Sequence, residues 1–360
     1  MKKIGIMTTG GDCSGLNTAI YGIVIGAAKR GWATYGILDG TDGLVGAEPN
    51  MIRITPDTLP PEQMSVAGSI LRNGNVGVTN NFERAVQSGK LPQFTKQLKK
   101  NLAAAKLDAL ILIGGNGSIS LAWNTRDIYS DLQLICIPKT IDMDIPLTDR
   151  TIGFDTAVSQ LTGFCDDLML TARSHHRWFV VQSMGRNSGA LALTSGLAAG
   201  ATAILIPEIK FDIDKLVTHI KNAPTDYGII MVSEGVRLRG HSGDAATMIS
   251  RKLTAAGIAN RTAFPEHIQR AGRTTPADRI LAISMANAAL DAVENNETYV
   301  MTALQNDEII TVGLDTVVSS GHPERDPNIT GLNISNAMVD DDNPLLIAAD
   351  NMCIYIGETK

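Results

Sequence analysis

Aromatic side chains are scarce in this sequence of 360 residues, at 4% of the total. Proteins that bind single-stranded nucleic acid commonly combine aromatic stacking platforms with a basic groove. Here 31 Lys and Arg residues stand against 37 Asp and Glu residues, which gives a net charge of -6. An acidic chain repels a polyanion unless its basic residues are gathered locally. The composition therefore argues against a nucleic-acid partner.

Cysteine is also rare, and the four residues Cys13, Cys136, Cys165 and Cys353 lie far apart. This spacing lacks the close pairs of a zinc site and the density of a small disulfide framework. We expect no protein-bound zinc and a reducing, cytoplasmic compartment. The basic N-terminus meets glycine before it builds a signal-peptide core. The long uncharged stretch 187–207 has the length of a membrane span, but small polar residues dilute it, so we expect a buried helix and then a buried strand.

Glycine is plentiful, at 34 residues, and hydrophobic residues make up 44% of the chain. Continuous apolar runs end at glycine or polar turns and alternate with helix-like segments, which is typical of parallel sheets covered on both faces. We therefore expect an α/β fold with two sheets. The expected strands are residues 3–8, 34–38, 109–113 and 134–137 in the first sheet and 178–181, 203–206 and 228–232 in the second, and the expected helices are 14–29, 155–171 and 277–295.

Three loops with unusual composition follow expected strands of the first sheet. They are residues 10–12, 114–118 and 138–144. In an open parallel sheet, the carboxyl ends of the strands lie along one edge, where ligands usually bind. Glycine allows the backbone to approach closely, and amide groups at the start of the following helix can face a phosphate. These loops predict a phosphate site, although a single Gly-Gly pair is usually only a turn.

The third loop contains two carboxylates, Asp142 and Asp144, two residues apart. One carboxylate can accept a hydroxyl proton while the other supports a metal, and phosphoryl transfer needs both functions. A solvated turn is the alternative explanation for such a pair. Lys139 can approach a phosphate as a mobile point charge, or it can be an exposed loop residue of no special role.

Basic residues recur in the second half of the chain, with a histidine and a glutamate near them. Each arginine alone fits a surface salt bridge, whereas the set can hold a phosphate through bidentate hydrogen bonds. The residues are Arg177, Arg186, Arg261, Arg270, His267 and Glu234.

Seven segments in a fixed order together resemble the phosphofructokinase family. They are TTGGDCSGLN, GGNGS, PKTIDMD, SHHR, SMGR, SEG and HIQRAG, and they cover roughly the first 280 residues. The resemblance implies two similar Rossmann-like lobes with mainly parallel sheets. It also implies Mg²⁺-dependent phosphoryl transfer to the 1-hydroxyl of fructose 6-phosphate, and a homodimer or homotetramer whose substrate site is shared between subunits.

The resemblance also implies roles for individual residues. Asp142 matches the general base, Asp144 and Asn116 match the metal positions, and Gly11, Thr140 and Arg186 match further catalytic positions. The implied donor-binding residues are Gly11, Gly115, Asn116, Gly117, Ser118 and Lys139. The implied substrate-binding residues are Thr140, Asp142, Asp144, Met184, Gly185, Arg186, Glu234, His267 and Arg270, together with Arg177 and Arg261 reaching across a subunit interface.

The phosphoryl donor is open between ATP and pyrophosphate. Gly117 matches the small residue that leaves room for a nucleotide, which favours ATP, whereas Lys139 matches a lysine of pyrophosphate-dependent members. Because the same Gly and Lys pair also occurs in ATP-using branches, we expect ATP.

Four positions depart from the family pattern. Asn116 replaces an Asp that supports the metal, Met143 replaces the Asn between the two aspartates, Asn75 replaces an Arg, and Glu266 precedes His267. These changes leave open a catalytically impaired subunit that binds sugar phosphate or regulates a partner. An NAD-kinase-like or lipid-kinase-like enzyme would not account for HIQR and SMGR.

The resemblance predicts two discontinuous lobes. The donor lobe would comprise residues 1–153 and about 270–320, and the sugar-phosphate lobe 154–269 and part of 321–360. The motifs do not explain the tail. Its acidic run, 340–342, fits a solvated segment, and residues 353–356 fit an edge strand or an interface cover.

Overall fold

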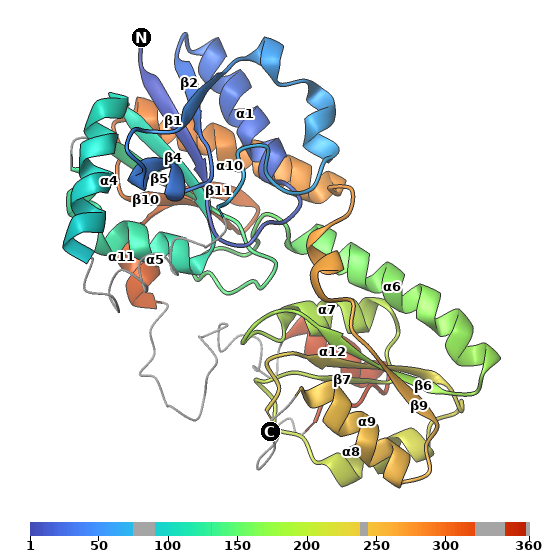
Figure 1. Ribbon diagram of the computed structural model, residues 1–360. Helices are drawn as coiled ribbons and strands as arrows, with labels where there is room; N and C mark the ends of the chain where they lie inside the picture. Colours follow the sequence, from blue (N-terminus) through green and yellow to red (C-terminus); the bar gives the residue numbers. More distant parts are fainter. Residues whose placement is uncertain (75–90, 131, 238–243, 321–342, 358–360) are drawn as a thin grey trace. The chain divides into compact units, whose positions relative to one another are not determined.

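The structure is a computed structural model that describes residues 1–74, 91–130, 132–237, 244–320 and 343–357 (Figure 1). The chain forms two compact units. Over their described residues, unit 1 comprises Met1–Thr140, Ile145–Thr156 and Arg270–Gly321, and unit 2 comprises Ile141–Asp144, Ala157–Gln269 and His322–Lys360.

Unit 1 is built on a mixed sheet. In the described part of this unit the strand order is β11-β10-β5-β4-β1-β2-β3. The five central strands are parallel, while β3 and β11 run antiparallel at the two edges. The strands are β1 (Lys3–Thr8), β2 (Ala33–Ile37), β3 (Met51–Ile54), β4 (Ala109–Gly114), β5 (Gln133–Pro138), β10 (Val300–Gln305) and β11 (Glu308–Gly313).

Helices cover both faces of this sheet (Figure 1). The pair α1 (Leu16–Lys29) and α10 (Pro276–Glu294) lies on one face, and α4 (Leu91–Ala105), α5 (Asn116–Asn124) and α11 (Leu314–Ser320) lie on the other. Strand β4 is buried along its whole length, as its uninterrupted apolar sequence predicts. The shorter elements are α2 (Asp42–Val45) and the 3₁₀ helices η1 (Pro56–Thr58), η2 (Pro61–Ser65) and η3 (Arg126–Tyr129).

Glycines allow α1 and α10 to pack closely. A Cβ atom on Gly22 would lie 2.9 Å from Cβ of Ala286, and one on Gly26 would lie 2.5 Å from Cδ1 of Leu290. Residues four apart share one face of a helix, so this pair of glycines forms a flat stripe against α10. That contact anchors the second half of α10 against α1.

Unit 2 has a smaller, fully parallel sheet with the order β7-β8-β6-β9 among its described strands. These are β6 (Trp178–Ser183), β7 (Ala203–Leu205), β8 (Gly228–Ser233) and β9 (Asn260–Ala263). Helices α8 (Ile213–Lys221) and α9 (Ala245–Ala255) pack on one face, and α7 (Ala190–Ala198) contacts the other. The remaining elements are α6 (Phe154–Ser174), η4 (Glu266–Arg270) and α12 (Pro344–Asn351).

The C-terminal tail adds to the edge of the unit 2 sheet. Tyr355 forms a parallel bridge with Ala203 of β7, and its hydroxyl group bonds to the backbone of Asp212, which caps α8. Of the two uses considered for residues 353–356, the structure shows pairing at the sheet edge, at this one bridge of the described tail. The acidic run 340–342 lies outside the described residues.

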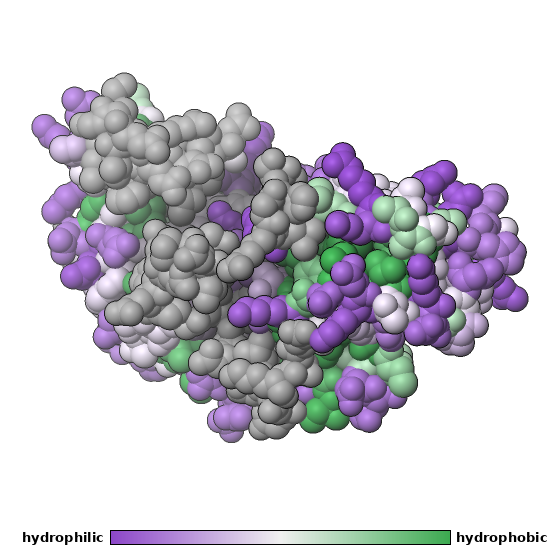
Figure 2. Space-filling model, turned by 90° about the horizontal axis from the view of Figure 1, so that it is seen from below, coloured by the Kyte–Doolittle hydropathy of each residue, from purple (hydrophilic) through white to green (hydrophobic). Residues whose placement is uncertain are grey.

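The expected α/β class with mainly parallel sheets is confirmed, and helix α6 passes from unit 1 into unit 2 after Thr156. The uncharged stretch 187–207 forms helix α7 and strand β7, as expected. Within the described residues, no helix has the length and apolar character that crossing a bilayer requires. The face drawn in Figure 2 mixes hydrophilic and apolar residues.

Candidate functional site

The first glycine loop leaves β1 and turns sharply. Thr9 continues the strand by donating its N–H to the carbonyl of Ile113, at 3.0 Å. Gly10 then adopts a φ of 78°, which a residue with a Cβ rarely adopts. The Nδ2 group of Asn73 donates to the Gly10 carbonyl at 3.0 Å, and the Nζ group of Lys139 donates to the Gly11 carbonyl at 2.5 Å. The loop is thus held by two residues distant in sequence.

The second glycine loop joins β4 to helix α5 and lies beside the first. A Cβ on Gly114 would lie 2.6 Å from Cβ of Ser118 and 2.7 Å from Oγ1 of Thr9, so this position has no room for a side chain. The Oγ atom of Ser118 lies 3.5 Å from the place of a Cβ on Gly10. Helix α5 begins at Asn116, and its first N–H groups give this corner a partial positive charge.

The third loop begins with Lys139, whose side chain is only 2% exposed. Its backbone N–H donates to the Gly114 carbonyl at 3.0 Å, and the N–H of Thr140 donates to the Ile152 carbonyl at 3.1 Å. The alternative of an exposed loop lysine was wrong, because this side chain turns under the first loop and reaches the Gly11 carbonyl. The structure therefore brings the first two loops together in unit 1 with the start of the third, Lys139 and Thr140.

Arg270 supplies a second cation at the first loop. Its guanidinium group occupies the space that a Cβ on Gly11 would need, and its Nη1 lies 3.8 Å from Oδ1 of Asp12. The chain just after Arg270 is fixed by Ser14, whose hydroxyl donates to the Gly272 carbonyl at 3.0 Å. A phosphate approaching Gly11 from this side would meet the guanidinium group.

The two aspartates of the third loop group with unit 2, whereas the lobe boundaries expected from the sequence place them with unit 1. Asp142 is half-buried and Asp144 is 9% exposed. Between them, Met143 has a φ of 52°, in the left-handed region that Asn and Gly tolerate best. The backbone thus keeps a shape that suits Asn, although the residue is Met.

Unit 2 assembles the proposed sugar-phosphate residues at the carboxyl ends of β6 and β8. The N–H of Arg186 donates to Oε1 of Glu234 at 2.6 Å, and the N–H of Met184 donates to Oε1 of Gln269 at 3.0 Å. Gly185, with a φ of 130°, forms the tight turn between Met184 and Arg186. Gln269 belongs to η4, which also carries the exposed His267. Backbone contacts therefore gather the SMGR, SEG and HIQR segments.

Arg177 and Arg261 lie elsewhere in unit 2. Arg177 precedes β6, whereas Met184 follows it, so about seven residues of strand at roughly 3.3 Å each separate them. Arg261 belongs to β9 and pairs in register with Phe179, near the start of β6. Within one chain the structure does not bring these two arginines close to Arg186 and Glu234. Asn75 lies outside the described residues.

Sequence reasoning missed two residues that the site depends on. Asn73 carries no motif signal, because an isolated Asn in a loop has many uses. Asp278 does carry one: Thr275, Pro276 and Asp278 form the start signature of helix α10. The Asp278 carboxylate is 1% exposed and accepts hydrogen bonds from the N–H groups of Gly153 and Thr156 and from the Thr156 hydroxyl. It fixes the start of α6.

Burial controls the titration of several groups in the chain. It raises the pKa of the Cys13 thiol to about 12, so this residue of the TTGGDCSGLN segment stays protonated and unreactive at neutral pH. Burial also raises the pKa of Glu208 and of Asp278. Neither carboxylate belongs to the predicted site.

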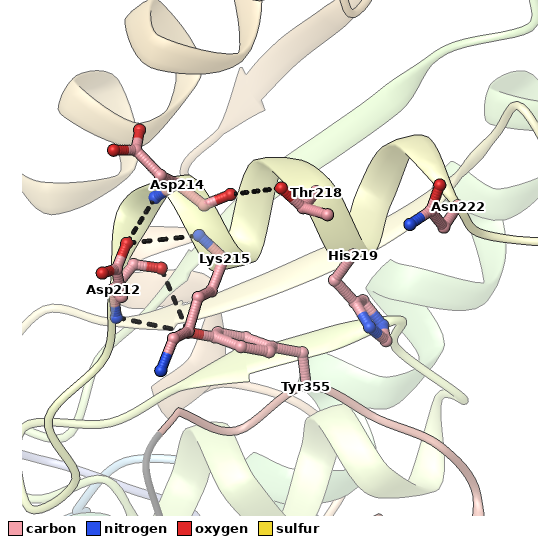
Figure 3. Close-up of a pocket in the computed structure, with 7 residues that line it drawn as sticks. All are labelled: Asp212, Asp214, Lys215, Thr218, His219, Asn222 and Tyr355. Atoms are coloured by element: carbon pink, nitrogen blue, oxygen red, sulfur yellow. Dashed lines mark hydrogen bonds between the residues drawn. The ribbon is translucent and has the colours of Figure 1, made fainter.

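Unit 2 also has a surface pocket (Figure 3). Helix α8 and Tyr355 line it, and the Tyr355 hydroxyl points to the backbone of Asp212. Its lining mixes Asp214, Lys215 and His219 without a motif that suggests a ligand. None of the residues expected to bind substrate or donor contributes to it.

The expected metal ligands fit Mg²⁺ in chemistry. Within the described residues, no three His, Cys, Asp or Glu side chains form a cage for a metal ion. Mg²⁺ usually uses one or two protein oxygens together with substrate phosphates. Asp144 supplies a carboxylate, and Asn116 supplies an amide oxygen, Oδ1, which lies 3.3 Å from the hydroxyl of Ser120.

Comparison with known proteins agrees with this arrangement. An ATP-dependent 6-phosphofructokinase 1 from Nostoc is 33% identical over 376 aligned positions, covering 99% of both chains. The phosphofructokinase of Saccharomyces cerevisiae superimposes with a TM-score of 0.80 at 26% identity, over 89% of this chain and 45% of that one, so this chain spans less than half of the yeast chain. A pyrophosphate-dependent phosphofructokinase from Marinobacter aquaeolei shares the fold, with a TM-score of 0.78 at 19% identity, over 100% of this chain and 93% of that one. The phosphofructokinase family model matches residues 3–293, and the chain belongs to the phosphofructokinase family.

Proposed function

We propose that this protein is a 6-phosphofructokinase that transfers the γ-phosphoryl group of ATP to the 1-hydroxyl of fructose 6-phosphate, giving fructose 1,6-bisphosphate. The meeting of the first two strand-end loops with Lys139, at the start of the third, carries the proposal. There Ser118 and Lys139 border Gly10, and the Arg270 guanidinium lies against Gly11. Backbone N–H groups, a helix N-terminus and two cations at one sheet edge suit a phosphate.

In this scheme Asp142 is the general base. The proton of the 1-hydroxyl moves to an Asp142 carboxylate oxygen as the hydroxyl oxygen bonds to the γ-phosphorus, and the bond from that phosphorus to the ADP oxygen breaks. The Gly11 N–H and Thr140 stabilise the transferring oxygens. Asp144 and Asn116 would hold Mg²⁺, which neutralises charge on the donor phosphates when bound.

Unit 2 would hold the sugar phosphate. Met184, Gly185, Arg186 and Glu234 form the backbone-linked cluster, with His267 on the adjoining η4. Arg270 completes the proposed set of substrate-binding residues. Unit 1 then acts as the donor lobe and unit 2 as the sugar-phosphate lobe.

Arg177 and Arg261 lie near the amino end of β6 and would serve the substrate site of a neighbouring copy. We therefore propose a cytoplasmic homodimer or homotetramer with shared sites. Replacing either arginine in a mixed oligomer should impair the site of the adjacent subunit.

ATP is the proposed donor, bound along Gly115, Asn116, Gly117 and Ser118. The identity to the ATP-dependent Nostoc enzyme supports it. Lys139, the one signal for pyrophosphate, donates to the Gly11 carbonyl, and this contact gives the lysine a use that does not depend on the donor.

Incubating the purified protein with Mg²⁺ and fructose 6-phosphate, and with ATP or pyrophosphate in separate reactions, tests this proposal. The bisphosphate formed is measured. We expect product with ATP. Product with pyrophosphate but not with ATP would show that pyrophosphate is the donor. Sugar-phosphate binding without product from either donor would favour an impaired regulatory subunit.

Asp142→Asn tests the base. Turnover should fall by at least about 100-fold while sugar-phosphate affinity changes little. Asp166→Asn, at an exposed position on α6, is the matched control and should keep full activity. Equal losses of turnover and affinity in Asp142→Asn would contradict the role of this carboxylate.

A further inference from the structure

Two side chains hold successive carbonyl groups of the first glycine loop. Asn73 donates to the Gly10 carbonyl and Lys139 to the Gly11 carbonyl, at 3.0 and 2.5 Å. They come from different segments, one after η2 and one at the end of β5. The two contacts fix two adjacent peptide planes.

A trans peptide is planar, and its N–H points away from its carbonyl. No described peptide bond is cis. Holding the Gly10 carbonyl therefore aims the Gly11 N–H in the opposite direction, and holding the Gly11 carbonyl does the same for the Asp12 N–H. In the part of the chain that the structure describes, neither N–H has an acceptor on the protein. Successive N–H groups beside a left-handed residue, here Gly10 with a φ of 78°, form a concavity that suits an anion.

Both holding residues are themselves fixed. The segment before Asn73 is tied to the end of β1, because the Thr8 hydroxyl lies 2.8 Å from the Ser69 hydroxyl and donates to the Arg72 carbonyl at 3.1 Å. Lys139 is anchored by its own N–H on the Gly114 carbonyl and is almost fully buried. Both side chains therefore start from backbone that is tied to the sheet edge.

We propose that Asn73 and Lys139 are positioning residues for phosphoryl transfer: they orient the N–H groups of Gly11 and Asp12 toward the transferring phosphoryl group. This inference rests on the proposed function, and it deepens it by assigning Lys139 to the loop backbone instead of to the choice of donor. The N–H groups bind the phosphoryl oxygens best as negative charge builds on them. Loss of either holding contact therefore lowers kcat more than donor affinity.

A double-mutant cycle separates this role from direct binding of the donor by Lys139. Two residues that act through one loop have effects that do not multiply, because the first substitution already frees the loop. Two residues that act independently have effects that multiply. Lys139→Met removes the ammonium group, and Asn73→Leu removes the donor amide at similar volume.

The experiment measures kcat, the KM for ATP and the Kd of the non-hydrolysable analogue β,γ-imido-ATP. The variants are Lys139→Met, Asn73→Leu, their combination, and Asn73→Asp, which keeps the shape of Asn but cannot donate from an ionised carboxylate. Lys99→Met and Asn124→Leu are the matched controls at exposed positions. Thermal unfolding shows that each variant is folded.

We expect each single variant to lower kcat by about 10- to 100-fold with the Kd within about threefold of the wild type. The double variant should lose much less than the product of the single losses, and Asn73→Asp should behave as Asn73→Leu does. A loss of analogue affinity with kcat unchanged in Lys139→Met would overturn the inference, as would fully multiplicative losses or normal kcat in Asn73→Asp.

A wild type that forms no bisphosphate would overturn the proposed function instead. A second readout covers that case: the amide resonance of Gly11 in protein labelled with ¹⁵N-glycine should shift when β,γ-imido-ATP is added. The inference requires this shift to shrink in Lys139→Met and Asn73→Leu but not in the control variants. An equal shift in all of them would refute it.

Discussion

Two buried carboxylates with raised pKa values should respond in opposite ways when each is replaced by its amide. Burial is the main cause of the raised pKa of both Glu208 and Asp278. Glu208 accepts one hydrogen bond on Oε1, from the Gly189 N–H at 2.8 Å, and within the described structure its buried Oε2 has no partner. Asp278 accepts two on Oδ2, from the N–H of Thr156 at 2.8 Å and from its hydroxyl at 2.6 Å.

Glu208→Gln keeps the bonded oxygen and places an uncharged NH₂ where the unpartnered oxygen lies. It keeps the Gly189 bond, and a buried unpaired amide costs less than a buried unpaired charge, so we expect stabilisation of up to about 1 kcal/mol at pH 7. Asp278→Asn either turns an NH₂ donor toward the Thr156 N–H or gives up the Gly153 bond at 3.0 Å. One buried group is then left unsatisfied, which costs about 1–3 kcal/mol.

The pH dependence follows from the raised pKa of Glu208. Its folded value lies above the ordinary 4.5, so the folded state holds the proton more tightly than the unfolded state. The tighter proton binding stabilises the folded wild type fully below about pH 4.5. This stabilisation is lost as the pH rises through the pKa that Glu208 has in the folded state. The Gln variant has no such loss, so its advantage should be greatest at neutral pH and should disappear below the ordinary value.

Urea unfolding at several pH values measures both effects. Trp178 is the tryptophan of β6 in unit 2, so its fluorescence reports on that unit once Trp32 and Trp123 are replaced by Phe. Far-ultraviolet circular dichroism follows the whole chain. Asp291→Asn, on the same helix as Asp278 but 57% exposed at its side chain, is the control and should cost less than about 1 kcal/mol. A destabilised Glu208→Gln, or an unaffected Asp278→Asn, would refute the reasoning.

Three further predictions concern the loops and the tail. Gly11→Ala should displace the Arg270 guanidinium and lower turnover by about 10-fold or more at unchanged melting temperature; steady-state kinetics beside Gly163→Ala, where a Cβ meets nothing within 4 Å, checks this. Met143→Asn should stabilise the chain by about 0.5–1 kcal/mol, because Asn tolerates positive φ; a lower melting temperature would contradict it. Tyr355→Phe loses two bonds to Asp212 and should raise amide exchange at the start of α8, at a cost of about 1 kcal/mol; unchanged exchange would count against it.

Much of the fold was predictable because its strands are continuous apolar runs. Strands β1, β4 and β8 lie within a residue of the expected ranges. Strands β10 and β11 were missed. The sequence signal was the pair Asn306 and Asp307 between them, residue types that tolerate positive φ, and in the structure these two residues have φ values of 51° and 65°, as in a tight hairpin. Strand β9 was missed because its sequence, NRTA, has no apolar period to detect.

In the candidate site, too, residues with a local sequence signal were found and residues that act through long-range contacts were not. The loops were found because glycine and aspartate after a strand carry a local signal. The residues that hold the first loop were not found, because their contacts join positions 63 and 128 residues apart in the sequence. Only the order of strands in the sheet brings such positions together.

That order also explains how a lysine can serve a distant carbonyl. Strand β4 lies between β1 and β5, so the ends of β1 and β5 are roughly 10 Å apart, at about 4.8 Å per strand. The Lys139 side chain must therefore pass the end of β4 to reach Gly11, and the residues there are Gly114 and Gly115. A Cβ on Gly115 would meet only the backbone carbonyl of Lys139, at 3.4 Å. Gly114, where a Cβ would meet Ser118 and Thr9, lets the first two loops pack together, and Lys139 can then hold the Gly11 carbonyl whichever phosphoryl donor the enzyme uses.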